Sequence, residues 1–520
     1  MSTTVDEPQH PREQSQPYTR SQRLTLLACI LGSSAAFLDG TIVNVALPAI
    51  RASLHGGLQT QEWVVDAYLL TLGALLLVGG SLGDVYGRRR IFALGVGGFG
   101  VASVACAFAP DAAFLITARA IQGIAAALLV PSNLALIMDT FSERQRAAAI
   151  GSWTAWTGIA TVAGPLLGGL LVQAASWRWV FVINVPLVLV TLWLARSIPA
   201  QPRDTSAKVD WTGGGLGALG LAGPIFALIE QPSYGWSSPR VAGAMAAGCA
   251  LLAIFCWWEQ RCANPMLPFG VFRARNFAVG NLATFLLYGG LSIATFFLVV
   301  FLQQVGGYEP LVAGLSTLPI SIMMFLLARR FGALADRLGP RLFMGVGPIV
   351  TGGGLLLLLL LHRYPDYFTE VLPGVTVLGL GLSITVAPLT ATVLSAAPSA
   401  HSGIASGVNN AISRVSGLIT IAVAGAVVSG HFSSQVLRAL QPAHQAGAPA
   451  AGSALARAAS ATLQVRVPPG FAAAARPHVH AVLVSASVGS FHLAMVLAAV
   501  LAILGGTLCL AGISNRSPSV

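Results

Sequence analysis

The sequence predicts an all-α membrane protein in which two six-helix bundles and two inserted helices give fourteen transmembrane helices. The first supporting observation is composition. Of 520 residues, 55% are hydrophobic and 9% are charged, which is too little polar surface for a water-soluble globule. The second is an internal repeat, because the loop GSLGDVYGR at residues 80–88 returns in outline as GALADRLGP at residues 332–340. Repeated membrane units are typical of transporters built from two related halves.

The positions of the spans follow from the thickness of the bilayer. A hydrocarbon core of about 30 Å needs about 20 helical residues per crossing. Apolar stretches of that length occur at residues 24–47, 63–82, 91–109, 113–138, 147–173, 179–195, 213–229, 241–258, 277–302, 311–328, 342–361, 371–396, 404–429 and 490–513.

These spans predict the organisation of the chain. We expect a cytoplasmic tail, an N-terminal six-helix bundle, two linker helices with their flanking loops, a C-terminal six-helix bundle and a second cytoplasmic tail, at residues 1–22, 23–200, 201–275, 276–513 and 514–520. The last bundle contains a long external loop at residues 430–489, in which we expect a short interfacial helix near residues 481–488.

The distribution of basic residues predicts orientation and location. No cleavable signal peptide is apparent, and most Lys and Arg side chains face the cytoplasm when both termini are placed there. The scarcity of Lys and the abundance of Ala, Gly and Arg favour a bacterial inner (plasma) membrane protein. The net charge of +11 then belongs to loops beside anionic lipid rather than to a nucleic-acid surface. We expect a monomer in the lipid bilayer whose partners are protons and a small-molecule substrate.

The energy source is constrained by a single residue. Lys208, the only lysine, follows Ala207, so the chain has no Gly-Lys pair for a phosphate-binding GxxxxGK[ST] loop. Transport would therefore use an ion gradient or a partner ATPase. We expect no cofactor and no metal, since no CxxC occurs and His478 with His480 make a weak ligand set.

Charged residues inside the predicted spans are the strongest functional candidates. Each costs about 2.5 to 3.5 kcal/mol at the bilayer centre. Among the acids, only Asp39 and Asp66 fall within the predicted spans, and Arg119 lies at a depth similar to that of Asp39. We expect Asp39 to carry a proton, Arg119 to tune it, and Asp66 to take part in proton coupling and to attract a cationic substrate. Asn44 and Asp66 are also expected to line the substrate cavity. The alternatives are a fixed structural ion pair for Asp39 and Arg119, and a solvated helix-end acid for Asp66.

Aromatic residues on the fifth and ninth spans are candidates for a substrate cavity, because aromatic faces suit flat or cationic compounds. Packing against lipid or within the core is the alternative. These residues are Trp153, Trp156, Phe285, Tyr288 and Phe296.

The repeated loop predicts a latch between helices. Gly80 and Gly87 permit a tight turn, Asp84 can face a helix N-terminus, and Arg88 can pair with Asp139. In the second copy Asp336 corresponds to Asp84, but Pro340 stands in the place of Arg88. A basic loop that only sets topology would explain the arginines but not Asp84. In the fifth span, small residues and a proline favour bending and tight packing, at Gly158, Gly164, Pro165, Gly168 and Gly169.

Taken together these motifs resemble the major facilitator superfamily, and within it the fourteen-span drug:proton antiporters of the multidrug efflux type. The resemblance extends from Leu24 to Ile513 and rests on residues 38–48, 80–90, 119–123, 158–169 and 177–186. It implies a major-facilitator fold and a proton-coupled secondary exporter of amphipathic or cationic drugs or antibiotics. It also implies that the latch holds the outward-facing state and that the motif of the fifth span belongs to antiporters.

Two other classes of function remain open. One is a narrow-specificity exporter or importer of a metabolite. The other is a membrane enzyme or receptor, which we do not expect because the chain lacks an HExxH pair and a recognisable output domain.

Overall fold

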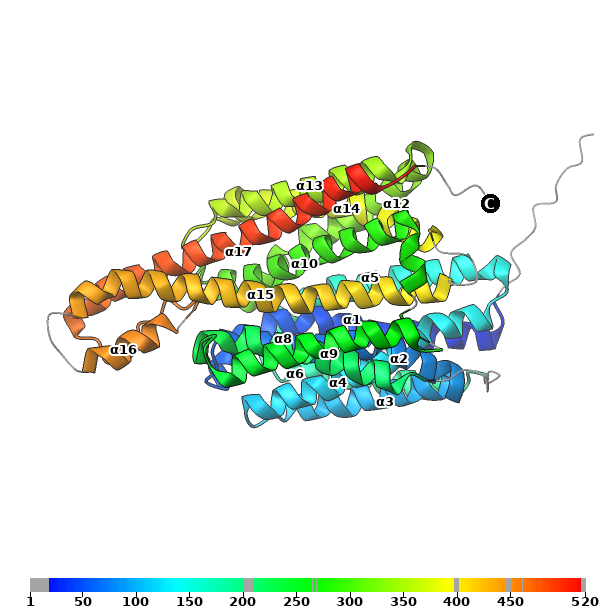
Figure 1. Cartoon of the computed structure of the whole chain (residues 1–520), viewed down its shortest axis with the longest axis horizontal. Helices are drawn as coiled ribbons and strands as arrows, with labels where there is room; N and C mark the ends of the chain where they lie inside the picture. The colour runs from blue at the N-terminus through cyan, green and yellow to red at the C-terminus, as the bar shows by residue number, and fades with distance from the viewer. Residues whose placement is uncertain are drawn as a thin grey trace, which may run out of the picture.

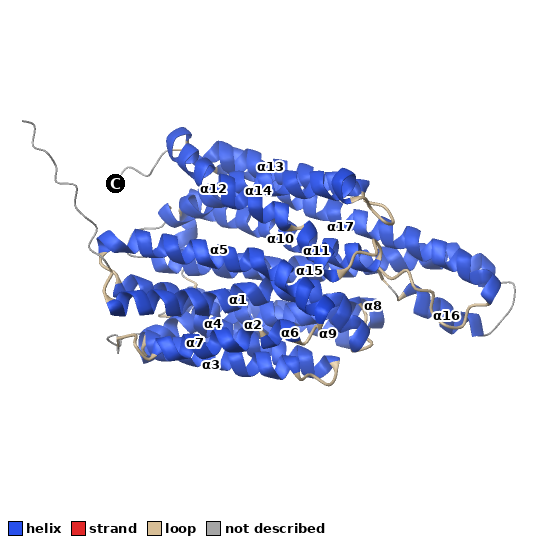
Figure 2. Ribbon diagram, turned by 180° about the vertical axis from the view of Figure 1, so that it is seen from behind, coloured by secondary structure: helices blue, strands red, loops and turns tan. Residues whose placement is uncertain are grey.

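The computed structural model describes residues 18–199, 209–263, 265–267, 269–396, 402–444, 450–460 and 462–515. Within these residues the secondary structure is helical and contains no strand (Figure 2). In this described part of the chain, thirteen helices are long and apolar enough to cross a membrane, and a shorter apolar stretch, Trp179–Ala195, occupies the predicted sixth span. The predicted all-α membrane fold is therefore confirmed.

The N-terminal half begins with a well-defined cap. The Thr19 side chain accepts from the Gln22 amide, and the Gln22 side chain accepts from the Thr19 amide, which starts the first helix. The helices of this half are α1 (Arg20–Ser53), α2 (Leu58–Tyr86), α3 (Arg88–Ala107), α4 (Ala112–Thr140), α5 (Glu143–Ala174), α6 (Trp179–Val182) and α7 (Asn184–Ala195).

Two helices separate the halves in sequence, α8 (Trp211–Tyr234) and α9 (Pro239–Arg261). They pack against each other, and α8 also contacts α2 and α15. They therefore cover the line where the two halves meet.

The C-terminal half repeats the architecture of the first. Its helices are α10 (Arg275–Gln304), α11 (Pro310–Ser316), α12 (Leu318–Leu338), α13 (Pro340–Leu357), α14 (Leu372–Ser395), α15 (Ser402–His444), α16 (Ala450–Ala459) and α17 (Arg476–Gly512). The repeated loop forms the same turn in both halves. Gly87 joins α2 to α3 with φ 97°, and Gly339 joins α12 to α13 with φ 89°. Only glycine adopts these backbone angles without strain, which explains why it is kept in both copies.

The predicted external loop at 430–489 is largely helical, which corrects that expectation. α15 continues to His444, α16 follows, and α17 begins at Arg476, so the expected short helix near 481–488 is part of α17. These helices extend beyond the others at one end of the molecule (Figure 1). Alanine favours helix outside the bilayer as well as inside it, and a small apolar core containing Phe432, Val436 and Leu483 holds the extension together.

The two ends of the bundle differ in how the halves meet. α1 begins and α17 ends at the same end, here called the terminal end, and the opposite end is the distal end (Figure 1). α2 and α15 run antiparallel along their length, with Gly73 beside Val415 and Gly425 beside Glu62. At the distal end α5 packs on α11. There the Gln303 side chain also donates from Nε2 to the Val45 carbonyl at 2.9 Å, which links α10 to α1.

Candidate functional site

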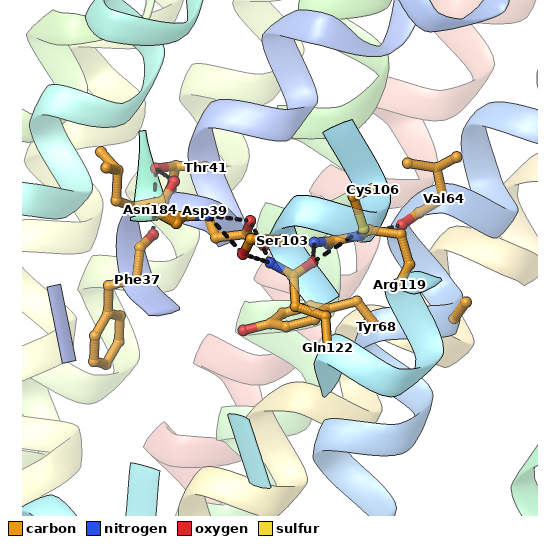
Figure 3. Close-up of polar contacts among 12 residues, drawn as sticks. Phe37, Asp39, Thr41, Val64, Tyr68, Ser103, Cys106, Arg119, Gln122 and Asn184 are labelled. Carbon is orange, nitrogen blue, oxygen red and sulfur yellow. Dashed lines mark hydrogen bonds and ion pairs between the residues drawn. The ribbon is translucent and has the colours of Figure 1, made fainter. Parts of the chain in front are cut away.

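A buried ion pair lies inside the N-terminal half. Arg119 Nη1 on α4 is 2.5 Å from Asp39 Oδ2 on α1 (Figure 3). Asp39 is 0% exposed and Arg119 is 1% exposed. The structure therefore brings together two residues that were expected to meet from their similar depths in the membrane.

Three neutral side chains complete the surroundings of the Asp39 carboxylate. Gln122 Nε2 donates to Asp39 Oδ1 at 3.0 Å, and Asn184 Nδ2 donates to the same oxygen at 3.1 Å. Gln122 also donates to Ser103 Oγ at 2.9 Å and accepts from Arg119 Nη1 at 2.6 Å (Figure 3). Both carboxylate oxygens are thus hydrogen-bonded, as buried charges require.

The Arg119 guanidinium is held from further directions. Its Nε donates to the Val64 carbonyl of α2 at 2.9 Å. The guanidinium carbon, Arg119 Cζ, lies 4.3 Å from the centre of the Tyr68 ring and 5.8 Å from that of the Phe181 ring, within cation–π range. The ion pair and its neighbours therefore connect six helices, α1, α2, α3, α4, α6 and α7. A change in the charge of the pair would alter contacts in most of this half.

A second group of acids lies on α2, close to the C-terminal half. Asp66 is fully buried, and neither carboxylate oxygen has a hydrogen-bond partner among the described residues. Glu62, one helical turn earlier, is 2% exposed and lies against Gly425 of α15. Trp63 between them donates to Glu230 of α8 at 2.9 Å. Buried carboxylates without partners are rare and are found at functional sites.

Glu62 and Glu230 correct one expectation from the sequence, that Asp39 and Asp66 are the only acids within spans. α2 begins at Leu58 rather than at residue 63, and α8 continues to Tyr234 rather than ending at 229. Each acid lies in the end of its helix, outside the apolar run. A span boundary placed by hydropathy therefore leaves it out, because the acid is itself polar.

The latch residues form a three-residue network at the terminal end. Arg88 Nη2 lies 2.9 Å from Asp84 Oδ1, and Arg88 Nη1 lies 2.5 Å from Asp139 Oδ1. Gly87 provides the turn that brings the start of α3 back to the end of α2, and Gly80 lies beside Pro131 of α4. The network thus fastens α2, α3 and α4 to one another within one half.

The second copy of the loop is fastened differently. Arg341 Nε donates to the Leu510 carbonyl of α17 at 2.6 Å, and the Arg341 amide donates to Asn515. Asp336 lies on α12, but its side chain is outside the described part of the structure. In the described part of the structure, Arg341 therefore bonds to α17 and to the residues that follow it, rather than to an acid.

The glycines of α5 mark where that helix meets others. A Cβ on Gly164 or Gly168 would collide with Thr41 or Ile42 of α1, and one on Gly169 would collide with the α11 backbone at Leu311. Gly314 of α11 lies directly against the Pro165 carbonyl. Gly158, in contrast, faces open space. Gly169 and Pro165 therefore allow a close backbone approach of α5 to α11, between the two halves at the distal end.

The family follows from the sequence taken over its length. Residues 29–421 match the model of the Major Facilitator Superfamily, which is well over half of the chain. The chain belongs to the major facilitator superfamily. This confirms the resemblance that the sequence motifs carry and makes the protein a transporter.

Relatives of this major facilitator are named for drug resistance. The multidrug resistance protein Stp of Mycobacterium tuberculosis is 36% identical over 427 residues, which are 80% of this chain and 77% of that protein. The methylenomycin A resistance protein of Bacillus subtilis is 35% identical over 410 residues, 78% of this chain and 87% of that protein.

A solved structure shows the same fold. The crystal structure of a bacterial homologue of the human lysosomal transporter Spinster, in an inward-facing and unoccupied conformation, aligns with a TM-score of 0.64 at 17% identity. The alignment covers 96% of this chain and all of that one.

The aromatic residues expected to line a cavity in this major facilitator are not equivalent. Phe296 is 1% exposed and packs edge-on against Phe297 in the core of the C-terminal half, so it is out of reach of a substrate in this conformation. Trp153 is half-buried and donates from its indole to Ser33 of α1 at 2.8 Å. Trp156, one turn along α5, is exposed.

The remaining cavity candidates lie on both halves. Phe285 and Tyr288 on α10 and Asn44 on α1 are half-buried. Arg414 of α15 reaches across the two halves, with its guanidinium 5.5 Å from the centre of the Phe37 ring of α1. The substrate role of these residues stays a prediction, and Arg414 joins them because it is a cation placed between the halves.

Two members of the Asp39 network, Gln122 and Asn184, were not identified from the sequence as site residues. Gln122 lies one turn after Arg119, so helical spacing alone places it on the same face. Asn184 begins α7, far away in sequence, and only the packing of α7 against α1 brings it to Asp39.

Proposed function

We propose that this major facilitator exports amphipathic or cationic drugs or antibiotics in exchange for protons. The observation that carries the proposal is the fully buried Asp39–Arg119 pair with its neutral donors, in a chain whose relatives are named for drug resistance. An intramembrane carboxylate that can gain and lose a proton is what coupling to a proton gradient requires.

We place the terminal end in the cytoplasm and the distal end outside a bacterial inner membrane, with the protein acting as a monomer. Positive loops at the terminal end support this orientation. In that orientation the described structure has its two halves joined at the external side, through α5 with α11 and α1 with α10. Alternating access would then rock the halves about the Gly-rich seam between α2 and α15.

In this proposal the two acidic groups have different tasks. Asp39 is ionised while it is paired with Arg119, and its protonation releases the guanidinium and loosens the contacts among the N-terminal helices. Asp66 and Glu62 lie where α2 faces the other half, so the surroundings of these carboxylates change when the halves move relative to each other. An ionised carboxylate without a partner is costly to bury, so a cation or a proton at Asp66 is favoured when the halves are closed around it.

Transport in everted membrane vesicles tests the proposal. We expect uptake of a cationic dye and of an uncharged antibiotic to depend on an imposed pH gradient and to stop when the gradient is collapsed. Uptake that persists without the gradient would contradict proton coupling.

The breadth of substrates decides between two forms of the proposal. One relative is named for many drugs and another for a single antibiotic, methylenomycin A. A panel of unrelated drugs, tested in a host that lacks its own pumps, would show resistance to many compounds for a multidrug exporter and to one for a narrow-specificity exporter.

A further inference from the structure

A cavity of about 950 Å³ lies at the distal end, between the end of α1 and the residues that precede and begin α17. It is separate from the Asp39 site. Its charged and titratable lining consists of Arg51, His55, Arg457, Arg466, Arg476 and His480. Among the described residues that line it there is no aspartate or glutamate. The cavity is therefore strongly positive.

The sequence explains why no acid balances these arginines. After Glu370 the chain contains neither Asp nor Glu, so the segment between α15 and α17 supplies cations alone. None of the ion pairs in the described part of the structure includes Arg51, Arg466 or Arg476. Like charges held near one another repel, and the cost is lowest when an anion lies among them.

The structure holds several of these side chains in place by neutral groups. Arg51 is 5% exposed, and its Nη1 donates to Gln304 Oε1 at 2.6 Å and to the Thr462 carbonyl at 3.3 Å. Gly470, with φ 108°, passes so close to Arg457 that a Cβ there would lie 3.1 Å from Arg457 Nη2. The two hydrogen bonds fix the Arg51 guanidinium, and both of their acceptors are neutral.

Further donors remain available to a ligand. A guanidinium has five N–H donors in a planar fork. Arg466 has no hydrogen-bond partner among the described residues, and Arg476 uses only Nε, towards the Phe471 carbonyl at 3.4 Å. His480 contacts the Val465 carbonyl through Nδ1 at 2.7 Å, so Nδ1 carries the proton and Nε2 is left for another partner.

We propose that this distal cavity binds a phosphate-bearing anion. Phosphate oxygens match the planar fork of arginine and form charge-assisted hydrogen bonds with it. The volume lies in the range of small-ligand sites. The phosphate comes either from the headgroup of an anionic phospholipid or from a soluble phosphate compound. Arg51 stands at the end of a membrane-crossing helix, within reach of both sources. The proposal makes no use of the transport mechanism.

Calorimetric titration of the full-length protein in neutral detergent tests this site. The probes are short-chain phosphatidylglycerol, short-chain phosphatidylcholine, glycerol 3-phosphate and pyrophosphate. The test variant is Arg466→Gln with Arg476→Gln. The matched control is Arg438→Gln, an exposed arginine on α15 that does not line the cavity. The single variant Arg466→Gln serves as well, because no described contact is lost with it. Size-exclusion profiles show that each variant is folded.

We expect at least one phosphate probe to bind the wild type and the control with similar affinity, and the double variant at least about tenfold more weakly. Binding of phosphatidylglycerol but not of the soluble phosphates identifies a lipid headgroup. Binding of the soluble phosphates with equal strength identifies a free anion. The proposal is overturned if no phosphate probe binds, if phosphatidylcholine binds equally well, or if Arg438→Gln weakens binding as much as the double variant.

Discussion

Arg119 Nη1 and Asp39 Oδ2 lie 2.5 Å apart in the interior of the N-terminal half, where both side chains are at most 2% exposed. Charges at this depth are tolerated only because each is paired and hydrogen-bonded. The pair is therefore both a structural contact among several helices and the place where one proton would change the charge of the bundle.

Asp39→Asn is expected to abolish transport driven by a pH gradient and also to lower stability. The substitution leaves the Arg119 charge buried without its counter-ion, which costs about 3 to 5 kcal/mol in comparable cases. Adding Arg119→Gln removes that charge, so the double variant should regain thermal stability but not transport. Melting temperature in detergent and vesicle uptake measure the two effects.

Asp111→Asn is the control for that experiment, because Asp111 caps α4 at the distal end and asparagine caps equally well. We expect it to keep both stability and transport. If the double variant Asp39→Asn with Arg119→Gln transports normally, the pair is a structural contact only and coupling lies elsewhere.

Asp66→Asn and Glu62→Gln are expected to affect cationic substrates more than neutral ones. A hydrogen bond to a charged group contributes about 1.5 to 3 kcal/mol where a neutral one contributes about 1. Export of a cationic dye should therefore fall at least about threefold more than export of a neutral drug, measured as uptake by everted vesicles. Equal losses for both classes would assign the acids to proton coupling, and no loss would remove them from the mechanism.

Asp84→Asn is expected to shift the conformational equilibrium without changing the substrate site. The Arg88 contacts are partly exposed, with side chains 29% to 46% accessible, so each is worth at most about 1 kcal/mol, or about fivefold in an equilibrium. If the latch favours the outward-facing state, cysteines placed at the distal end should be labelled more slowly in the variant.

Arg89→Gln is the matched control for the latch, since Arg89 is the next residue along and donates to the Arg196 carbonyl rather than to an acid. Labelling that responds equally to both substitutions would reflect the basic character of the loop alone. Labelling that responds to neither would leave the loop with a role in topology only.

Gly169→Ala is expected to prevent full closure of the distal end. A methyl group there would collide with the α11 backbone at Leu311, and neither backbone can move aside without separating α5 from α11. Transport should fall at least about tenfold, and distal cysteines should become more reactive.

Gly158→Ala on the same helix is the matched control, because no atom of another helix lies within 4 Å of the position of its added Cβ. This variant should transport normally, and the gain in helix propensity should leave stability unchanged or slightly raised. Similar losses in both variants would show that α5 needs backbone freedom rather than close packing against α11.

The sequence alone was sufficient to predict the membrane fold, the duplicated halves and the glycine turn at 87. Each of these rests on local information: hydropathy reports helices, and a positive φ requires glycine wherever it occurs. Depth along the helices was also enough to bring Asp39 close to Arg119, because each residue advances about 1.5 Å along its helix.

Tertiary structure decided which side chains complete each site. Asn184 reaches Asp39 only through the packing of α7, and Glu62 enters the bundle because α2 starts earlier than its apolar core. The distal cavity joins Arg51 to Arg466, two residues more than 400 positions apart whose common environment no local pattern encodes. The rotation and pairing of helices depend on how their surfaces fit together, and that fit is a property of the whole bundle rather than of any segment.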